Sequence, residues 1–294
     1  MTPDHQGPSL RPTAPSDLGP DPLAQQTGNP TVAELRALWE HRDLLLQFAF
    51  NDLKHRYIGS SIGVFWMVIN PIVELLTYTF VFGVLMNVRY SAGGGVAQYS
   101  LFLFCGMVAW FSVSESLTRA TTSITDNAHL IKKARFPAAI LPGHVVMSAL
   151  FNQAVRTLIL AVGVIFLGQG LSGWFLLVPA FMVIQTFFVL GLAFFLATAQ
   201  VYFRDTAHWV NAVLLAWMFM TPIFYPPSAY PEQFKILLVT NPLAHTVGIY
   251  QELILNQRLP HQISVAMVLL SAMIFFIAGV SFFAHHRKKF ADLA

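Results

Sequence analysis

The feature that most limits how this chain can fold is a set of long apolar segments in its last four-fifths. They cover about residues 62–86, 99–122, 141–168, 174–202, 207–225 and 262–284. Each is long enough to cross a hydrocarbon layer of about 30 Å at a helical rise of about 1.5 Å per residue. Charged residues make up only 11% of the chain, whereas a soluble domain carries about 25%. The sequence therefore predicts an all-α membrane protein with six transmembrane helices.

Lysine and arginine are unevenly divided between the two sides of this arrangement. One side collects Lys54, Arg56, Lys132, Lys133, Arg135, Arg204, Arg287, Lys288 and Lys289. The other side has Arg89, Lys235 and Arg258. Short cytoplasmic loops carry an excess of these residues. The distribution predicts a multi-pass protein of the bacterial inner membrane with both termini in the cytoplasm.

Two segments precede the first apolar stretch. Residues 1–30 are rich in Pro, Gly, Asp, Gln and Thr and have no apolar core of a secretory signal, which predicts a disordered cytoplasmic tail. Residues 31–57 place apolar residues among charges at helical spacing, which predicts an amphipathic helix at the membrane interface. Thr31 and Glu34 have the spacing of a capping box at its start.

The rest of the chain divides into the six-helix domain, residues 58–286, and a short cytoplasmic tail, residues 287–294. Within the domain, the external segment 226–261 is half apolar and interrupted by proline. Its apolar runs are too short to span, so we expect two short re-entrant helices between helices 5 and 6. An external cap resting on the bilayer is the alternative.

Ionisable side chains inside the predicted spans are the first candidates for a functional role. Glu74, Glu115 and Arg156 lie well inside them, and Arg119 lies near the cytoplasmic end of the second span. A charge in hydrocarbon costs at least about 2.5–3.5 kcal/mol, so such groups face protein or water. Glu74 and Arg156 lie at similar depths, and we hypothesise that they pair. Lining a polar pathway is the alternative.

Catalytic chemistry finds little support in the sequence. Cys105 is the single cysteine, no phosphate-binding Gly-x-x-x-x-Gly-Lys-Ser/Thr loop occurs, and the histidines are scattered. The serines near Glu115 lack a nearby base. We expect no catalytic residue, no metal ligand, no cofactor in this chain and no nucleic-acid partner. A membrane-embedded enzyme or a scaffold without transport remains an alternative.

The loop NAHLIKKARFPAAILP, residues 127–142, combines a short amphipathic helix, a cationic patch and a Phe-Pro break. This pattern favours a docking element for a cytoplasmic partner. An ordinary positively charged cytoplasmic loop fits the composition equally well. The candidate docking residues are His129, Leu130, Lys132, Lys133, Arg135 and Phe136.

Five segments, taken in order, resemble the permease subunits of ATP-binding-cassette polysaccharide exporters of the type-2 class. They are KHRYIGSSIGVFWMVINP at 54–71, the loop at 127–142, VYFRDTAHWV at 201–210, TPIFYP at 221–226 and NPLAHTVGIYQELIL at 241–255. The resemblance covers about residues 35–285. Members of this family export O-antigen, capsule or teichoic acid chains.

The resemblance implies a homodimeric permease that works with two copies of a separate ATPase, on which Mg-ATP is bound. It implies that a lipid-linked polysaccharide moves through a channel formed by the membrane helices. Residues 31–57 match the family's gate helix, residues 127–137 its coupling loop, and residues 226–258 its external re-entrant helices. A type-2 permease for a small hydrophobic molecule or drug is the alternative.

Residue roles follow from the same resemblance. Arg42, Lys54 and Arg56 on the gate helix are candidates for contact with the lipid diphosphate. Aromatic rings line the family's channel and offer apolar faces to sugars, although most aromatic residues in spans pack against helices or lipid. The candidate channel aromatics are Phe65, Trp66, Tyr78, Phe80, Trp110, Phe111, Phe224 and Tyr225.

Overall fold

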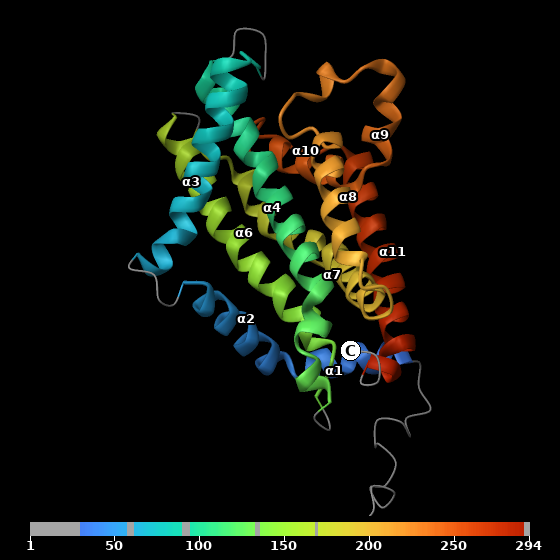
Figure 1. Cartoon of the computed structure of the whole chain (residues 1–294). Helices are drawn as coiled ribbons and strands as arrows, with labels where there is room; N and C mark the ends of the chain where they lie inside the picture. Colours follow the sequence, from blue (N-terminus) through green and yellow to red (C-terminus); the bar gives the residue numbers. More distant parts are fainter. Residues whose placement is uncertain (1–29, 58–61, 90–94, 133–135, 168–169, 291–294) are drawn as a thin grey trace, which may run out of the picture.

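The computed structural model describes residues 30–57, 62–89, 95–132, 136–167 and 170–290, and these are helical or irregular without a β-strand. The α-helices are α1 (Pro30–Glu40), α2 (Arg42–Tyr57), α3 (Trp66–Tyr78), α4 (Val96–Asp126), α5 (Ala128–Ile131), α6 (Ile140–Phe166), α7 (Val178–Tyr202), α8 (Thr206–Met220), α9 (Lys235–Thr240), α10 (Pro242–Ile254) and α11 (Gln262–His286). Figure 1 shows the long helices running side by side as one bundle, with α1 and α2 across one end and α9 at the other. Of the expected tail, residues 1–30, all but Pro30 lie outside the described residues, as do residues 291–294, and Pro30 begins α1.

Five helical segments of the described chain are long and apolar enough to cross a membrane. They are Trp66–Leu85, Val96–Asp126, Ile140–Phe166, Gly173–Tyr202 and Gln262–Lys289. These correspond to five of the six predicted spans, and the prediction of an all-α membrane protein is confirmed. The remaining one, α8, has only 15 residues, which at about 1.5 Å per residue is shorter than the hydrocarbon layer. A sixth span therefore stays a prediction.

The core of the bundle is built around α4. In the most apolar part of α4, 72% of the residues are buried, because α6, α7, α8 and α10 all pack against it. Behind it, α7 and α11 approach each other closely at Gly191 and Gly279. A Cβ atom on Gly279 would lie 1.9 Å from the Gly191 carbonyl oxygen, so this crossing requires small residues, as is common between membrane helices.

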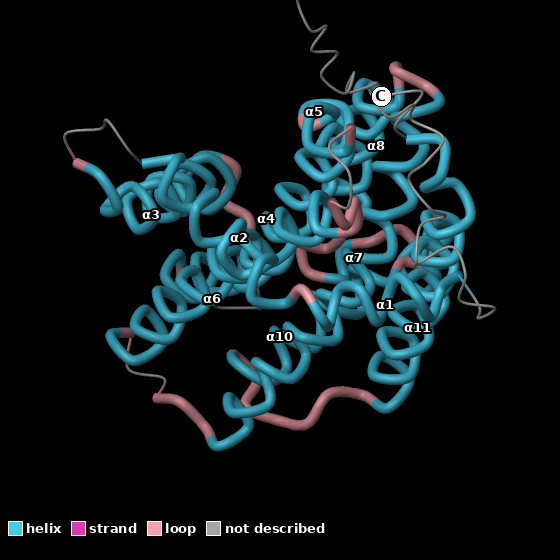
Figure 2. The backbone as a smooth tube through the Cα atoms, turned by 90° about the horizontal axis from the view of Figure 1, so that it is seen from below, coloured by secondary structure: helices cyan, strands magenta, loops and turns pink. Residues whose placement is uncertain are grey.

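The first span is the least buried of these five segments, although Gln262–Lys289, with 22% of its apolar window buried, is nearly as uncovered. Only 17% of the apolar window in Trp66–Leu85 is buried, and α3 contacts α6 and α4 along a limited face. Its last turns, Thr79–Leu85, adopt a π-helix. Figures 1 and 2 both show α3 at the edge of the bundle, away from α7 and α11.

The segment predicted as one amphipathic helix forms two. The α-helix α1 ends at Glu40 and α2 begins at Arg42, with His41 between them accepting a backbone hydrogen bond from Leu45. The predicted capping box is wrong, because Thr31 lies inside α1 and its hydroxyl donates to Ser281 on α11 at 3.1 Å. The side chain of Glu34 instead pairs with Arg287 at 2.5 Å. The position of α1 is thus fixed by tertiary contacts with the end of α11.

The segment between α8 and α11 contains two short α-helices, α9 and α10, as the sequence predicts. The Asn241 side chain caps α10 by accepting a hydrogen bond from the Leu243 amide at 3.0 Å. The helix α10 packs into the bundle against α4 and α11, and most of its residues are buried. Re-entry into the bilayer itself stays a prediction.

Candidate functional site

The helix α2 lies under the bundle and along α6 (Figure 1). Ser148 on α6 donates a hydrogen bond to the Ala49 carbonyl oxygen at 3.0 Å. Gly143 gives Leu45 room, because a Cβ there would lie 2.9 Å from Leu45 Cδ1. These contacts hold α2 against the half of α6 that is predicted to be cytoplasmic.

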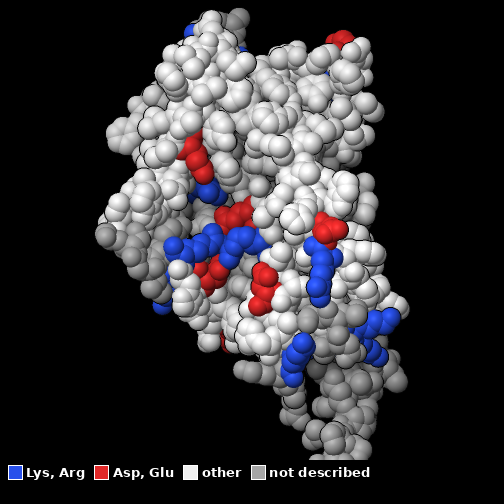
Figure 3. All heavy atoms as spheres, in the orientation of Figure 1, with Lys and Arg blue, Asp and Glu red and all other residues white. Residues whose placement is uncertain are grey.

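Charged side chains from α2, α4 and α6 meet in one group, which we call the ionic cluster. Its members are Asp52, Arg56, Glu115, Arg119, Asn152 and Arg156. Figure 3 shows acidic and basic side chains close together on this face, below a surface that is almost free of charge. The charged side chains are 13% to 33% exposed.

Glu115 on α4 is the centre of the ionic cluster. Arg56 Nη1 donates to its Oε1 atom, and Asn152 Nδ2 donates to both carboxylate oxygens at 2.9 and 3.2 Å. Nη1 atoms of Arg119 and Arg156 lie 3.8 Å from the same carboxylate. One carboxylate thus joins arginines from three helices.

Asp52 on α2 is the second carboxylate of the cluster. Arg56 Nη2 lies 3.1 Å from Asp52 Oδ2, and Arg119 Nη2 lies 2.5 Å from Asp52 Oδ1. Arg119 belongs to α4. Asp52 on α2 thus pairs with an arginine of α4, whereas Glu115 on α4 pairs with Arg56 of α2. The two carboxylates and three guanidinium groups leave the ionic cluster with one excess positive charge.

The predicted Glu74–Arg156 pair is replaced by a different arrangement. Arg156 forms its ion pair with Glu115 and stacks over the Phe111 ring, with 4.9 Å between Cζ and the ring centroid. Glu74 on α3 interacts electrostatically with both Arg156 and Glu115 without an ion pair within 4.0 Å among the described residues. Glu74 therefore lies at the edge of the ionic cluster rather than in it.

Several guanidinium nitrogens of the ionic cluster are buried without a hydrogen-bond acceptor in the described chain. They are Arg56 Nε, Arg119 Nη1, Arg156 Nε and Arg156 Nη1. Buried polar groups are normally satisfied by protein, water or ligand. The ionic cluster can therefore donate several further charge-assisted hydrogen bonds, and an oxyanion is the ligand class that accepts them best.

The other two gate-helix candidates lie elsewhere. Arg42 is exposed, and it contacts Trp39 through a 3.3 Å hydrogen bond to the carbonyl oxygen and through the indole ring. Lys54 is exposed on α2. Of the three basic residues predicted to act together, only Arg56 belongs to the ionic cluster.

The predicted docking residues lie on and after α5, which follows the end of α4. His129 and Lys132 are exposed and Leu130 is half-buried, whereas Lys133 and Arg135 lie outside the described residues. The Phe136 ring packs against Phe48 on α2 with 5.9 Å between centroids. The loop after α4 is thereby in direct contact with the helix that carries Asp52 and Arg56.

The chain is similar to a known family of membrane transport proteins. Residues 45–255 match the model of the ABC-2 type transporter family. The chain belongs to the ABC-2 type transporter family. It is accordingly a multi-pass membrane protein and the permease subunit of a transporter rather than an enzyme, and the predicted family resemblance is confirmed.

The alignments of this ABC-2 protein with curated relatives span nearly the whole length of those relatives. The chain is 31% identical over 261 residues to the O-antigen export system permease protein RfbA of Myxococcus xanthus, with 88% of this chain and 98% of the relative aligned. It is 28% identical over 252 residues to a protein of the same name from Klebsiella pneumoniae, with 85% and 95% aligned.

Three of the predicted channel aromatics of this permease gather near the end of the bundle that holds α9. Tyr78 lies 5.5 Å from Phe224, centroid to centroid, and Phe82 stacks on Phe224 at 4.8 Å. Phe224 is buried, and its carbonyl oxygen accepts a hydrogen bond from Tyr99 at 2.9 Å. Tyr225 follows it in the chain. Phe82 is a member that the sequence analysis missed.

The other predicted aromatics have separate surroundings. Trp110 is buried in the core of the single chain, edge-on to Trp217 at 6.4 Å between centroids, and Phe111 lies under Arg156. A channel role for these rings stays a prediction. The remaining candidates are exposed or half-buried at the first span: Phe65, Trp66 and Phe80.

A second polar group, which we call the amide network, lies in the core and was not predicted. Gln153 Nε2 donates to Gln185 Oε1 at 3.1 Å, the Tyr250 hydroxyl donates to the same oxygen at 2.8 Å, and Gln185 Nε2 donates to the Ala109 carbonyl oxygen at 3.1 Å. The three side chains are almost fully buried. The amide network joins α4, α6, α7 and α10 without any charge.

Proposed function

We propose that this chain is the transmembrane subunit of an ATP-driven exporter that moves a lipid-linked polysaccharide of the O-antigen type out of the cytoplasm. The observation that carries this proposal is the similarity to O-antigen export permeases over 98% of the length of one relative. The glycan is large and rich in hydroxyl groups, so it needs a polar path through hydrocarbon. The membrane is the bacterial inner membrane.

The proposed orientation has α1, α2, α5 and both termini on the cytoplasmic side. Its support is the accumulation of basic residues at this end of the bundle, where Lys54, Arg56, Lys132 and the Arg287–Lys289 turn are found. The α9 end is then external. Cysteine labelling with a membrane-impermeant reagent at exposed positions of α5 and α9 tests this, and labelling of α5 from outside contradicts it.

The proposed assembly is a homodimer with two copies of an ABC ATPase. Support for the dimer comes from α3, whose apolar surface is largely uncovered, because a second copy provides a protein partner for that face and encloses a pathway between the two. ATP, with its Mg²⁺, is bound and hydrolysed on the ATPase subunits.

Coupling to the ATPase follows a short physical route in this proposal. The ATPase contacts the loop around α5, and Phe136 transmits its movement to Phe48 on α2. Substituting Lys132, Lys133 and Arg135 together by alanine is expected to weaken ATPase co-purification several-fold while membrane insertion stays normal. Unchanged co-purification with full export would contradict docking at this loop.

The ionic cluster is the proposed contact for the diphosphate of the lipid carrier. Its guanidinium nitrogens without a hydrogen-bond acceptor among the described residues and its excess positive charge suit a phosphate group. Arg42 and Lys54 lie on α2, the helix that also carries Arg56, for the initial approach. Movement of α2 changes the distance between Arg56 and Glu115. When the two separate, Arg56 can pair with the diphosphate, and when they meet again the diphosphate is released.

The experiment that tests the function is genetic complementation with a glycan readout. Cells that lack this gene are expected to accumulate lipid-linked polysaccharide inside and to lose it from the surface, and the wild-type gene with its ATPase restores surface glycan. Normal surface glycan in the deletion strain would overturn the proposal. ATP-dependent movement of a small hydrophobic dye by the purified complex, without glycan export, would favour the drug-permease alternative.

A further inference from the structure

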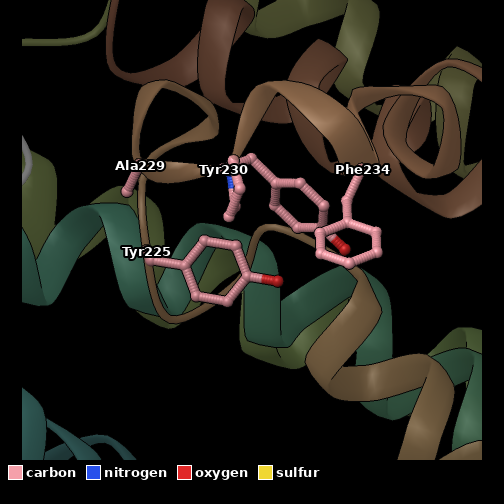
Figure 4. A pocket seen from close by; sticks show the side chains of 5 residues that line it. Tyr225, Ala229, Tyr230 and Phe234 are labelled. Carbon is pink, nitrogen blue, oxygen red and sulfur yellow. The ribbon is translucent and has the colours of Figure 1, made fainter.

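Aromatic rings gather toward both ends of the bundle, in two different ways. At the α9 end, a small pocket is lined by rings that all belong to the one segment between α8 and α9, as Figure 4 shows: Tyr225, Tyr230 and Phe234. Toward the other end, Phe194 lies on α7, Phe283 on α11, and Phe290 directly after the turn Arg287–Lys289 that follows α11. The second group joins elements that are distant in the sequence. We call it, with the buried apolar side chains around it, the terminal cluster.

The rings of the terminal cluster are closely packed. The centroid of Phe283 lies 4.9 Å from that of Phe194 and 5.2 Å from that of Phe290, and both pairs meet edge to face, an arrangement that aromatic rings prefer. The Phe290 side chain is fully buried. The last residues of a chain are usually poorly ordered unless contacts tie them down. The residues after α11, which the sequence assigns to a short tail, thus begin with an anchored turn.

The docking loop, residues 127–142, contributes to the same cluster. Ala139 is one of its buried members, and Ile131 at the end of α5 and Ala138 pack against it. Ile124, near the end of α4, is a further buried member that precedes the loop. The segment that is proposed to bind the ATPase therefore packs against the same apolar cluster as Phe290.

The helix α1 meets the terminal cluster and the end of α11 at three points. Leu38 packs against the cluster, Thr31 Oγ1 donates to Ser281 Oγ at 3.1 Å, and Glu34 pairs with Arg287 at 2.5 Å. The Glu34 side chain is only 3% exposed, so the cost of removing its charge from water offsets much of the attraction. The apolar contact is therefore the principal stabilising link between α1 and this end of the bundle.

We propose that Phe290 is a coupling residue, whose buried ring makes the docking loop, α1 and the end of α11 move as one unit. The proposal rests on the proposed function, in which the ATPase contacts the docking loop. It adds a second path for the movement, because the contact of Phe136 with Phe48 reaches α2, whereas this one reaches α1 and the last membrane helix. Close-packed interiors have low compressibility and transmit displacement. Without the ring, a cavity would allow the loop to move while α1 stays in place.

Export and ATP hydrolysis, measured on the same variants of the complex, test this role. Phe290→Ala removes the ring, and we expect surface glycan to fall several-fold while the purified complex still assembles and hydrolyses ATP at close to the wild-type rate. Phe290→Leu keeps an apolar side chain of similar size and should restore most of the export. Lys289→Ala, at the exposed neighbouring position, is the matched control and should export normally.

Hydrogen exchange of the complex with and without a non-hydrolysable ATP analogue measures the movement itself. In the wild type, the amides of α5 and of α1 should both change their exchange rates when the nucleotide binds. In Phe290→Ala, the change in α5 should remain and the change in α1 should be lost. A ring that only stabilises the fold would instead alter exchange equally with and without nucleotide, and would leave the response of α1 in place.

Leu38→Ala removes the α1 side of the same contact and keeps the three rings, so it carries the test if Phe290→Ala does not assemble. It too should lose the α1 response. Normal export in Phe290→Ala, or a wild-type response of α1 in either assembled variant, would overturn the coupling role. Glycan export that depends on the gene, together with one of these results, would leave the exporter function standing. Normal surface glycan in the deletion strain would remove both proposals.

Discussion

The ionic cluster and the amide network are built on adjacent faces of the same helix, and they solve the problem of polar groups in a membrane in opposite ways. Asn152 and Arg156 on α6 face the ionic cluster, whereas Gln153 faces the amide network and the Thr157 hydroxyl donates to its carbonyl oxygen at 2.8 Å. Residues four apart share a helix face, and a step of one residue turns to another. One turn of α6 therefore divides the charged region from the neutral one.

The two regions differ in exposure and in satisfaction of their hydrogen bonds. In the amide network Gln153, Gln185 and Tyr250 are at most 1% exposed, and each makes two or more hydrogen bonds. Gln153 Oε1 is the one polar side-chain atom of these three residues that lacks a partner among the described residues. The ionic cluster is up to 33% exposed, and several of its guanidinium nitrogens have no hydrogen-bond acceptor among the described residues. Neutral amides can be sealed at modest cost, whereas charges require partners or water.

This difference shows that polar groups inside a membrane protein can either hold helices together or remain available to a ligand. The amide network holds α10 to the bundle and has little capacity left for a ligand. The ionic cluster joins α2 to the bundle through contacts that another anion can replace. We therefore expect substitutions in the amide network to lower stability alone, and substitutions in the ionic cluster to lower export.

The largest effect is expected for Glu115→Gln. The amide keeps the shape but removes the negative charge that Arg56, Arg119 and Arg156 share, and loss of one partner of a buried ion pair costs about 3–5 kcal/mol, less where water enters. Surface glycan is expected to fall more than ten-fold, and trypsin should cleave α2 faster at Lys54 or Arg56.

A matched control for this prediction lies at the other end of the bundle. Glu252 accepts a hydrogen bond from Arg258 Nη2 at 2.8 Å, which lowers its pKa, and Arg258 is largely exposed. Glu252→Gln should leave export nearly unchanged, because the Arg258 side chain is 67% exposed and water can replace its lost partner. Equal loss of export in both variants would break the distinction between the ionic cluster and an ordinary ion pair.

An intermediate effect is expected for Gly143→Leu, which leaves every charge of the ionic cluster in place. A Cβ at this position already lies 2.9 Å from Leu45 Cδ1, so the larger side chain must push α2 away from α6. Overpacking of this kind costs about 1–3 kcal/mol. Export should therefore fall several-fold. Gly170 is not a suitable control position, because its φ of 67° would strain any residue with a side chain.

Gly173 provides a suitable comparison, since it has open space around its Cβ position. Gly173→Ala and Gly143→Ala should differ in export in the order of their available space, with Gly173→Ala close to wild type. Normal export in Gly143→Leu would show that the position of α2 does not matter, and would leave the charges of the ionic cluster as the whole of the effect.

The sequence was sufficient for the fold because its main signal is long-range and one-dimensional. Apolar segments as long as Val96–Asp126 and Gln262–Lys289 have only one stable solution in lipid, which is a helix. The short α8 and the break at His41 were harder to predict. The start of α1 was also harder to predict, because the tertiary contact between Glu34 and Arg287 replaces the local cap there.

The candidate site was predictable in part. Charged residues are rare inside long apolar segments, so Glu115, Arg119 and Arg156 could be chosen from their positions within the predicted spans. Their partners could not, because depth does not give the rotation of a helix about its axis, and Arg156 turned out to face Glu115 rather than Glu74. The amide network had no sequence signal at all, since glutamine and tyrosine in apolar segments are common.

A smaller effect on export is expected for Gln185→Met, in the amide network. The substitution removes the acceptor of Gln153 and Tyr250 and the donor to Ala109. Hydrogen bonds between membrane helices contribute on average about 0.6 kcal/mol each, so the unfolding free energy should fall by about 1–2 kcal/mol. The thermal midpoint should drop by a few degrees while export per folded molecule stays normal. A large loss of export from a folded Gln185→Met variant would assign the amide network a part in transport.

The smallest effect is expected for Glu34→Gln, which tests a charge pair outside both regions. Burial raises the pKa of Glu34, and Arg287 offsets this only in part. Docked α1 thus binds a proton more tightly than detached α1, so docking is strongest at low pH and weakens as pH rises from the ordinary range of a glutamate through the raised pKa. Glu34→Gln removes this dependence and should change docking only slightly at neutral pH, because the cost of burying the carboxylate offsets its attraction to Arg287. Hydrogen exchange of α1 amides, taken as the ratio of wild type to variant at each pH, measures it. A ratio showing that wild-type docking strengthens as pH rises would mean that attraction to Arg287 outweighs burial, and would make this pair a stabilising link like those in the ionic cluster.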